Sequence, residues 1–203
     1  MSRTGGDLTK KRILMIAERL FSEKGFDATS VDSIAKKAKV NKALIYYHFK
    51  DKNDIISSLF KNIIKELSRQ IGSSIEDFHK KSKLPVEEKI RKEIVLLDDK
   101  KDILSVLLME GLKSKNKNFQ LFELANIVIE NEKKSVLEKL KSQNEDDKLK
   151  QLYIHEFFTG ILPMIMFVAL RDKWSAYYKT NPDETLNNFI DSFINSHIKS
   201  HIA

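Results

Sequence analysis

Cysteine is absent from this sequence of 203 residues, and its absence excludes several kinds of chemistry. The chain can form no disulfide, use no thiolate as a nucleophile and offer no cysteine ligand to zinc, which is typical of an intracellular protein. Proline is scarce, with three residues, while 32% of the residues are charged and 41% are hydrophobic. This composition predicts an ordered, soluble chain that is long enough for one large or two small domains.

Long hydrophobic runs are also absent. The longest apolar stretch covers residues 157–170 and is interrupted by Thr159, Gly160 and Pro163. It is shorter than the roughly 20 residues that a membrane-spanning helix needs, so we interpret it as a buried helix. The first residues are polar and lack the apolar segment of a signal peptide. We therefore expect a cytoplasmic protein with no membrane partner.

The motifs of common enzymes and metal sites are missing. There is no glycine-rich phosphate-binding loop, and His155-Glu156-Phe157-Phe158-Thr159 lacks the second histidine of a zinc-protease helix. His197 and His201 are four residues apart, but the pair lies near a C-terminal end, where a cation suits the helix dipole. We expect no catalytic residue, no cofactor and no metal site, and therefore a protein that is not an enzyme.

Positive charge is concentrated in the first quarter of the chain. Residues 1–52 contain 12 Lys and Arg against 6 Asp and Glu, a net charge of +6, whereas residues 53–203 contain 24 and 23, a net charge of +1. A basic segment on a near-neutral body indicates a polyanionic partner, because lysines that neutralise phosphates release condensed counterions. A merely solvated surface is the alternative, and charge alone does not decide between the two.

Helical periodicity runs through nearly the whole sequence, and no segment shows the alternation of a β-strand. We therefore expect an all-α fold. The expected helices cover residues 8–24, 30–38, 42–49, 51–78, 85–97, 101–114, 117–142, 147–178 and 183–201. Gly25 should end the first helix in a left-handed conformation, and Pro163 should kink the helix that contains it. Asn181-Pro182-Asp183-Glu184 combines a cap, a proline at the first position and acidic residues in the first turn.

Two short helices joined by a tight turn follow the first helix. Thr29-Ser30-Val31-Asp32 fits a capping box, with the threonine hydroxyl at the cap of the second helix and a carboxylate three residues on. Asn41 can cap the third helix, and only Lys39 and Val40 separate the second helix from it. This arrangement predicts a helix-turn-helix at about residues 30–49.

The third helix is expected to have an unusual exposed face. Ile45 and Phe49 are four residues apart and can enter a small core. The other side then carries Ala43, Leu44, Tyr46 and Tyr47. Two tyrosines and a small residue are uncommon on a solvated face, whereas they suit a helix that lies in the major groove of DNA. The tyrosine hydroxyls can donate hydrogen bonds to phosphates, and a small residue lets the backbone approach the bases.

Residues 28–35 and 38–52 closely resemble the DNA-binding domain of TetR-family regulators. The run Tyr46-Tyr47-His48-Phe49 and Lys52 are highly specific to that family, and the resemblance covers residues 8–67. The family usually has glycine where this chain has Lys39, and often glycine at Ala43. Either Lys39 adopts a left-handed conformation at some cost, or the turn differs slightly.

The resemblance implies a homodimer whose two recognition helices occupy successive major grooves of a partly palindromic, double-stranded DNA operator. It also implies a DNA-binding domain at residues 7–67 and a larger helical domain for ligand binding and dimerisation at residues 68–203. In the family, the positions that commonly meet DNA match Thr29, Ser30, Asn41, Lys42, Ala43, Tyr46, Tyr47, His48 and Lys52. Repression is the commoner outcome; the alternatives are an activator of the same fold, a helical enzyme or a helical interaction protein.

The C-terminal helices are expected to form the dimer. The last helix carries a wide apolar stripe, and two copies of it could pack with the apolar helix at residues 157–170 into a four-helix interface. The expected interface residues are Phe157, Ile161, Leu186, Phe189, Ile190, Phe193 and Ile194. Packing of this stripe only inside its own chain is the alternative.

Aromatic and methionine side chains of the larger domain could line a site for an unknown small-molecule effector, hydrophobic or cationic, that releases DNA. The expected residues are Met109, Glu110, Phe122, His155, Phe158, Met166, Trp174 and Tyr177. The alternative is that these side chains belong to the ordinary core or surface.

Overall fold

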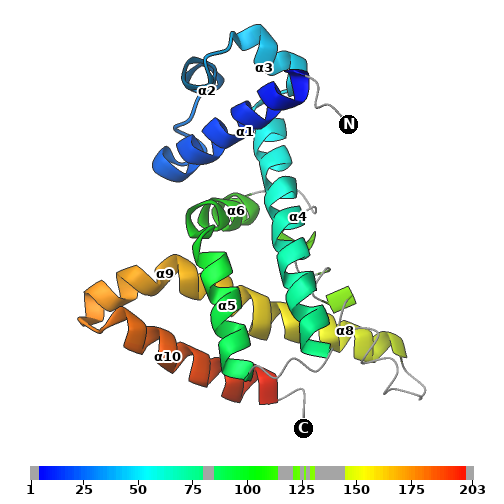
Figure 1. The fold of residues 1–203 in the computed structure, drawn as a ribbon, viewed down its shortest axis with the longest axis vertical. Coiled ribbons are helices and arrows are strands. Elements are labelled where there is room, and N and C mark those ends of the chain that lie inside the picture. Colours follow the sequence, from blue (N-terminus) through cyan, green and yellow to red (C-terminus); the bar gives the residue numbers. More distant parts are fainter. Residues whose placement is uncertain are drawn as a thin grey trace. The chain divides into compact units, whose positions relative to one another are not determined.

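The computed structural model describes residues 5–79, 85–113, 121–123, 126, 129–130 and 145–199. Every regular element in this part of the chain is a helix, which confirms the all-α expectation. The chain divides into two compact units. Unit 1 comprises Met1–Lys65 and Ser105–Gln120, and unit 2 comprises Glu66–Leu104 and Leu121–Ala203. Two helices, α4 and α6, contribute residues to both units (Figure 1).

Helix α1 (Gly5–Lys24) supplies much of the core of unit 1. Ile13, Ala17 and Leu20 recur at helical spacing and are fully buried, so one face of the helix packs inward. The helix begins three residues before the expected start. Gly25 follows its last residue with φ of +81°, a conformation that glycine adopts without strain, and this confirms the expected helix end.

Helix α2 (Val31–Ala38) has a different cap from the expected one. The cap is Ser30, whose Oγ accepts a hydrogen bond from the backbone N–H of Ser33 at 3.1 Å. The Thr29 side chain is buried instead, and its hydroxyl is shared between the carbonyl oxygens of Leu20 at 3.2 Å and Gly25 at 2.9 Å. The expectation of a Thr29 cap was wrong because two adjacent hydroxyls fit the same sequence pattern, and only the extended backbone of Ser30 aims its oxygen at the helix.

The turn between α2 and α3 (Lys42–His48) is tight, as expected. Lys39 adopts the left-handed conformation, with φ of 53° and ψ of 46°, which decides between the two alternatives for this position. Asn41 caps α3, because its Oδ1 accepts a hydrogen bond from the Leu44 backbone N–H at 2.7 Å. Ile45 and Phe49 are buried, which confirms the predicted orientation of the helix.

Helix α4 (Lys52–His79) begins at a reciprocal pair of caps. The Asp51 carboxylate accepts a hydrogen bond from the Asp54 backbone N–H at 2.9 Å, and the Asp54 carboxylate accepts one from the Lys50 backbone N–H at 2.9 Å. Such pairing fixes the residue at which the helix starts. The expected apolar face is buried at Ile55, Ile56, Leu59, Ile63, Ile64 and Leu67.

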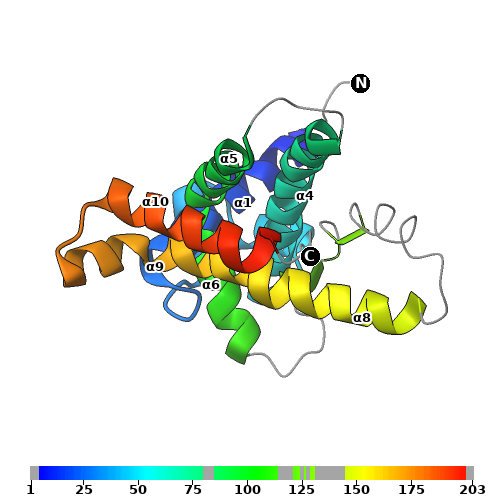
Figure 2. The ribbon, with the colours of Figure 1, turned by 90° about the horizontal axis from the view of Figure 1, so that it is seen from below.

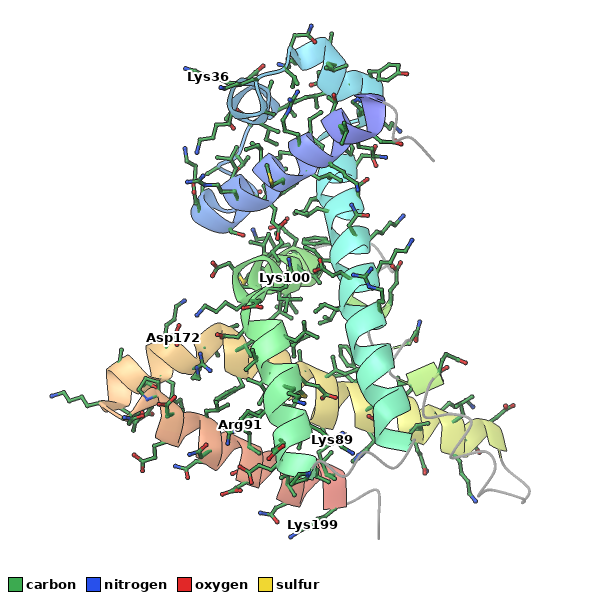
Figure 3. The ribbon with its side chains drawn as sticks, viewed as in Figure 1. Lys36, Lys89, Arg91, Lys100, Asp172 and Lys199 are labelled. Atoms are coloured by element: carbon green, nitrogen blue, oxygen red, sulfur yellow. The ribbon has the colours of Figure 1, made fainter. Side chains whose placement is uncertain are left out.

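Unit 2 contains an antiparallel pair of helices, α9 (Leu162–Tyr178) and α10 (Pro182–Phe193) (Figures 1 and 2). It also contains α5 (Val86–Asp98) and α8 (Glu145–His155), whereas α6 (Lys101–Lys113) lies mostly in unit 1. Helix α5 packs against both members of the pair. Its Arg91 donates a hydrogen bond to Asn187 of α10 at 2.8 Å (Figure 3), and its Asp98 pairs with Arg171 of α9 at 3.2 Å. The start signals at residues 181–184 are confirmed, since Asn181 caps α10.

The helix expected at residues 147–178 is helical from Glu145 to Tyr178, but its regular winding is interrupted. A π-helical segment, Glu156–Ile161, joins α8 to α9. The backbone N–H of Leu162 therefore bonds to the carbonyl of Phe157, five residues earlier. Pro163 is the second residue of α9, so the wider turn lies just before the proline at which a kink was expected. A second π-helical segment, Ile194–Ile198, follows α10. The helix expected at residues 117–142 lies mostly outside the described residues.

One helix of the described part, Asp146–Tyr178, is long and apolar enough to cross a membrane by length and composition alone. It has 33 residues, more than the interrupted apolar stretch indicated. The core helix of a soluble protein passes the same test. Ile165 and Val168 of this helix are buried, whereas Met166, Leu170 and Trp174 are exposed.

Candidate nucleic-acid interface and apolar groove

Helix α3 presents two tyrosines to solvent. Tyr47 is 80% exposed and Tyr46 is 49% exposed, and Ala43 lies on the same outer side. The buried side chains of Ile45 and Phe49 hold the opposite side of the helix in the core of unit 1. The tyrosines are therefore presented by a fixed helix, where two large amphipathic side chains can contact a partner without a change of fold. Leu44, expected on the outer side, is half-buried.

The N-termini of α2 and α3 carry exposed polar caps. Ser30 and Asn41 each accept a hydrogen bond from their own helix, and both are exposed. The backbone N–H groups of a first helical turn and the helix dipole together attract anions. The caps therefore place donor groups beside the outer face of α3, in positions suited to phosphate oxygens.

Two residues that were expected to contact DNA, Thr29 and Lys52, instead make hydrogen bonds within the protein. The Thr29 side chain is buried, with its hydroxyl donating to backbone carbonyls. The Nζ atom of Lys52 donates a hydrogen bond to the carbonyl of Phe26 at 2.9 Å and lies 4.2 Å from the centroid of the Phe26 ring. Both side chains thus hold the loop between α1 and α2, and this loop sets the position at which α2 begins.

The other two basic candidates also have neighbours. Lys42 pairs with Asp32 at 2.9 Å, and the hydrogen bond and charge of that carboxylate raise the pKa of Lys42. Both side chains are well exposed, so the pair costs little to open for a phosphate. His48 is half-buried, with its ring against Tyr47 at 5.0 Å, and its Nε2 is enclosed. A phosphate would reach that nitrogen only after the ring turned.

Two further lysines were missed by the sequence analysis. Lys10 of α1 lies 5.4 Å from the centroid of the Phe49 ring, which brings a positive charge to the end of α3. Lys36 of α2 projects away from its neighbouring helices (Figure 3). The basic bias of residues 1–52 was a signal for both, but nothing in their spacing distinguished them from other lysines.

The expected effector residues are not gathered in one cavity. Met109 and Glu110 belong to unit 1, where Glu110 pairs with Lys113 at 3.0 Å. In unit 2, the Phe157 ring contacts those of Phe122 and Phe158, with ring centroids 5.0 and 4.9 Å away. The other four residues lie elsewhere in unit 2: Tyr177 is 79% exposed, His155 is half-buried, and Met166 and Trp174 line a groove.

This groove is open, has a volume of about 490 Å³ and lies between α9 and α10. Its apolar lining comes from Met166, Phe167, Leu170, Trp174 and Phe189. The rings of Phe167 and Phe189 stack at 3.9 Å and form the floor where the two helices meet. Residues from both the effector set and the dimer set thus lie on one open apolar surface.

The remaining dimer candidates are largely covered within their own unit. Phe157, Ile190 and Phe193 are buried, while Ile161, Leu186 and Ile194 are half-buried. The sequence analysis did not assign to the dimer a row of exposed apolar side chains along α8, the π-helical segment and α9, although it named three of them as effector residues. The row consists of Ile154, Phe158, Met166, Leu170, Trp174 and Tyr178. The last helix has a clear amphipathic pattern. The helix before it has apolar residues on all sides, so its sequence did not show which face is exposed.

One cluster in unit 2 has the donors of a metal site, although none was expected from the sequence. Candidate ligand atoms of His155, Glu156 and His197 all lie within 4.8 Å of one another. The His155 and His197 rings stack with centroids 4.8 Å apart. His155 and Glu156 are neighbours in sequence, and the packing of the two π-helical segments brings His197 to them.

Residues 13–59 match the family model described as "Bacterial regulatory proteins, tetR family". Along most of its length, the chain is similar to the uncharacterized HTH-type transcriptional regulator YhgD of Bacillus subtilis. Their identity is 26% over 188 residues, which cover 90% of this chain and 92% of that protein. A shorter match is to the negative transcriptional regulator IcaR of the biofilm operon icaADBC in Staphylococcus aureus. It has 46% identity over 52 residues, 26% of this chain and 28% of that protein.

The fold is shared with solved structures. The regulator FadR from Bacillus subtilis, determined in complex with stearoyl-CoA, superposes with a TM-score of 0.61 at 22% identity. The alignment covers 91% of this chain and 97% of that one. Both units are therefore included in the shared fold.

Proposed function

The chain belongs to the TetR family of DNA-binding transcriptional regulators, and from that premise we propose that it is a repressor that binds a partly palindromic operator as a homodimer and is released by a small molecule. The observation that carries the DNA-binding part is the pair of exposed tyrosines, Tyr46 and Tyr47, on a helix fixed by buried Ile45 and Phe49. A short, rigid helix of this kind fits the major groove.

We assign the DNA contacts to two groups. The outer face of α3, with Ala43, Tyr46 and Tyr47, meets bases and nearby phosphates. Ser30, Asn41 and Lys42 meet phosphates at the two capped helix N-termini. We assign a mainly structural role to Thr29, His48 and Lys52. The buried Thr29 hydroxyl and the hydrogen bond from Lys52 to Phe26 hold the start of α2 in place.

Repression is supported by the likeness to IcaR, whose name describes a negative regulator. The likeness covers only the DNA-binding part, so it bears on how DNA is bound. A chain that occupies an operator overlapping a promoter blocks transcription without any further contact. We therefore favour repression over activation, and with it a cytoplasmic location beside the DNA.

The homodimer is proposed to form through the exposed row on α8 and α9 together with the groove between α9 and α10. Leu170, Trp174 and Phe189 would be covered by a second copy, which removes apolar surface from water. This assignment moves Met166 and Trp174 from the effector set to the dimer set. Two copies related by a twofold axis would match a palindromic operator, because each presents one α3.

The effector is proposed to be an apolar small molecule. The solved FadR complex with stearoyl-CoA supports this class, because that regulator shares the fold. In this chain the aromatic contacts of Phe122, Phe157 and Phe158 offer an apolar surface in unit 2. A molecule that binds the DNA-free form better than the DNA-bound form lowers operator affinity.

The test is a fluorescence anisotropy titration of the full chain on DNA fragments from upstream of its own gene, at several salt concentrations. Tyr47→Ala should weaken binding by about 5-fold to 100-fold, the usual range for loss of one good contact. Tyr177→Ala is the matched control, because Tyr177 is equally exposed but lies in unit 2. Sedimentation of the free chain and of the complex gives the number of copies.

Affinity should fall steeply with salt, because several lysines displace counterions from phosphates. If Tyr47→Ala and Tyr177→Ala bound DNA equally well, the assignment of α3 as the recognition helix would be wrong. A free chain that sediments as a monomer and binds the operator as a monomer would overturn the dimer.

A further inference from the structure

Two π-helical segments pack against each other in unit 2, Glu156–Ile161 after α8 and Ile194–Ile198 after α10. π-helical turns are rare and occur frequently at functional sites. Glu156 opens the first segment, His155 immediately precedes it, and His197 lies in the second. The unusual winding of both segments is therefore located where two imidazoles and a carboxylate meet.

These three side chains form a nitrogen and oxygen donor set in a shielded place. Their candidate ligand atoms lie within 4.8 Å of one another, and Nε2 of His197 is 3.6 Å from Oε2 of Glu156. Glu156 and His197 are 2% and 5% exposed. A buried carboxylate is costly unless a positive charge compensates it, and a bound cation supplies that charge. Two histidines with one carboxylate suit divalent first-row transition metals.

The Thr159 hydroxyl holds both histidine rings in a useful orientation. It donates a hydrogen bond to the His155 carbonyl at 2.7 Å, and its oxygen lies 3.2 Å from Nδ1 of His155 and 2.9 Å from Nδ1 of His197. A hydroxyl has one proton and two lone pairs, so in the tautomer that carries the ring proton on Nδ1 the Thr159 oxygen accepts from both Nδ1–H groups. That tautomer leaves both Nε2 atoms able to bind a metal ion. Metal-bound histidines commonly carry such a hydrogen bond on their other nitrogen.

Gly160 gives the His197 ring its space. A Cβ atom at this position would lie 2.8 Å from both Cε1 and Nε2 of His197, closer than a real Cβ contact allows. Any other residue would therefore displace the very nitrogen that faces Glu156.

We propose that His155, Glu156 and His197 bind a divalent first-row transition-metal ion, with Zn²⁺ as the reference ion, through Nε2 of each histidine and the carboxylate. Because the His155 and His197 rings stack, at least one imidazole rotates out of the stack when both nitrogens form metal bonds of about 2.0–2.2 Å. The half-buried His155 and the exposed Thr159 lie on the side from which an ion can enter.

The experiment is calorimetric titration of Zn²⁺ into the full, chelator-treated chain at pH 7.5 in a buffer that does not bind metal. One ion per chain is expected. Glu156→Gln and His197→Ala should weaken binding by more than 100-fold, beyond the roughly 10-fold to 100-fold loss typical of supporting residues. Thr159→Val should fall within that smaller range. His201→Asn and His79→Asn are matched controls that remove a histidine elsewhere and should leave the affinity unchanged.

Circular dichroism of each variant without metal checks that it folds. If a substitution at a buried residue prevents folding, Thr159→Val still tests the site, because Thr159 is exposed. A Co²⁺-loaded chain should show ligand-field absorption bands that disappear in Glu156→Gln. Absence of saturable binding in the wild-type chain would overturn the proposal. Loss of binding in His201→Asn with full binding in Glu156→Gln would also overturn it, because the ion would then sit on the C-terminal histidine pair. Neither outcome bears on DNA binding, so the proposed function is tested separately.

Discussion

Replacing Thr29 with valine separates a structural role for this residue from direct contact with DNA. Thr29 is 1% exposed, and its hydroxyl donates a hydrogen bond shared between the carbonyl oxygens of Leu20 and Gly25. Valine has the same shape, so no cavity forms, but the buried Leu20 carbonyl and the partly buried Gly25 carbonyl lose this hydrogen-bond donor. A buried polar group left without a partner costs about 1–3 kcal/mol. We expect Thr29→Val to lower the free energy of unfolding of unit 1 by about 2 kcal/mol.

Hydrogen exchange measured by mass spectrometry can locate this loss. A change of about 2 kcal/mol makes exchange through global opening of unit 1 roughly 30-fold faster. Peptides of unit 2 should be unaffected, and the fluorescence of Trp174, the single tryptophan, reports on that unit independently. Ser33→Ala is the control: it removes a similar hydroxyl-to-carbonyl bond at an exposed site, where water replaces it. The expected change there is below about 0.5 kcal/mol.

DNA binding gives the result that would refute this reasoning. Well below its unfolding temperature, Thr29→Val should bind operator fragments with nearly the wild-type affinity. If the variant kept its stability but lost DNA binding, the hydroxyl would be a direct DNA contact, and the inward orientation argued above would be wrong.

Two further substitutions test the backbone and a buried charge. Lys39→Gly should stabilise unit 1 by up to about 1 kcal/mol in urea denaturation, because a left-handed conformation strains every residue except glycine and a few others; an unchanged midpoint would refute the strain. Burial raises the pKa of Glu93 from 4.5 to about 7, so the folded chain holds a proton that the unfolded chain releases, and stability falls as pH rises between these values. Glu93→Gln removes this penalty, so the variant should be more stable than the wild-type chain by at most about 3 kcal/mol above pH 7 and should have no advantage below about pH 4. Glu88→Gln is the exposed control, and an equal gain in stability from it would contradict the explanation.

The sequence was most informative where local rules determine structure. The buried pair on α3, the Asn41 cap, the Gly25 helix end and the start of α10 all follow from spacing and cap chemistry within a few residues. The choice between Thr29 and Ser30 as the cap did not, because both carry hydroxyls and the difference lies in which one the core accepts. The backbone conformation of Lys39 could not be predicted for a related reason, because only the observed turn decides whether a lysine adopts the left-handed conformation there.

Unit 2 was less predictable because its distinctive features depend on contacts between distant residues. Apolar periodicity is the same in an α-helix and in a short π-helical interruption, so the turn at Glu156–Ile161 left no pattern. The meeting of His155 with His197 depends on that turn and on the missing side chain of Gly160. The dimer expectation focused on the last helix, yet Ile190 and Phe193 are buried inside their own chain. Burial within one chain and burial between two chains select the same residue types.

The π-helical turn at Glu156–Ile161 also lets this helix absorb a genetic change of length. A π-helical turn holds about one residue more than the α-helical turn that it replaces. Deleting one codon within it would restore regular winding and barely shorten the helix. The residues on either side would keep nearly the same orientation about the helix axis, because the turn itself takes up the extra residue. A one-residue deletion inside α8 or α9 would instead rotate every later residue by about 100° relative to the earlier ones, because that is the angle between successive residues of an α-helix. Natural variants of this chain should therefore tolerate a one-residue deletion in this segment more readily than one within α8 or α9.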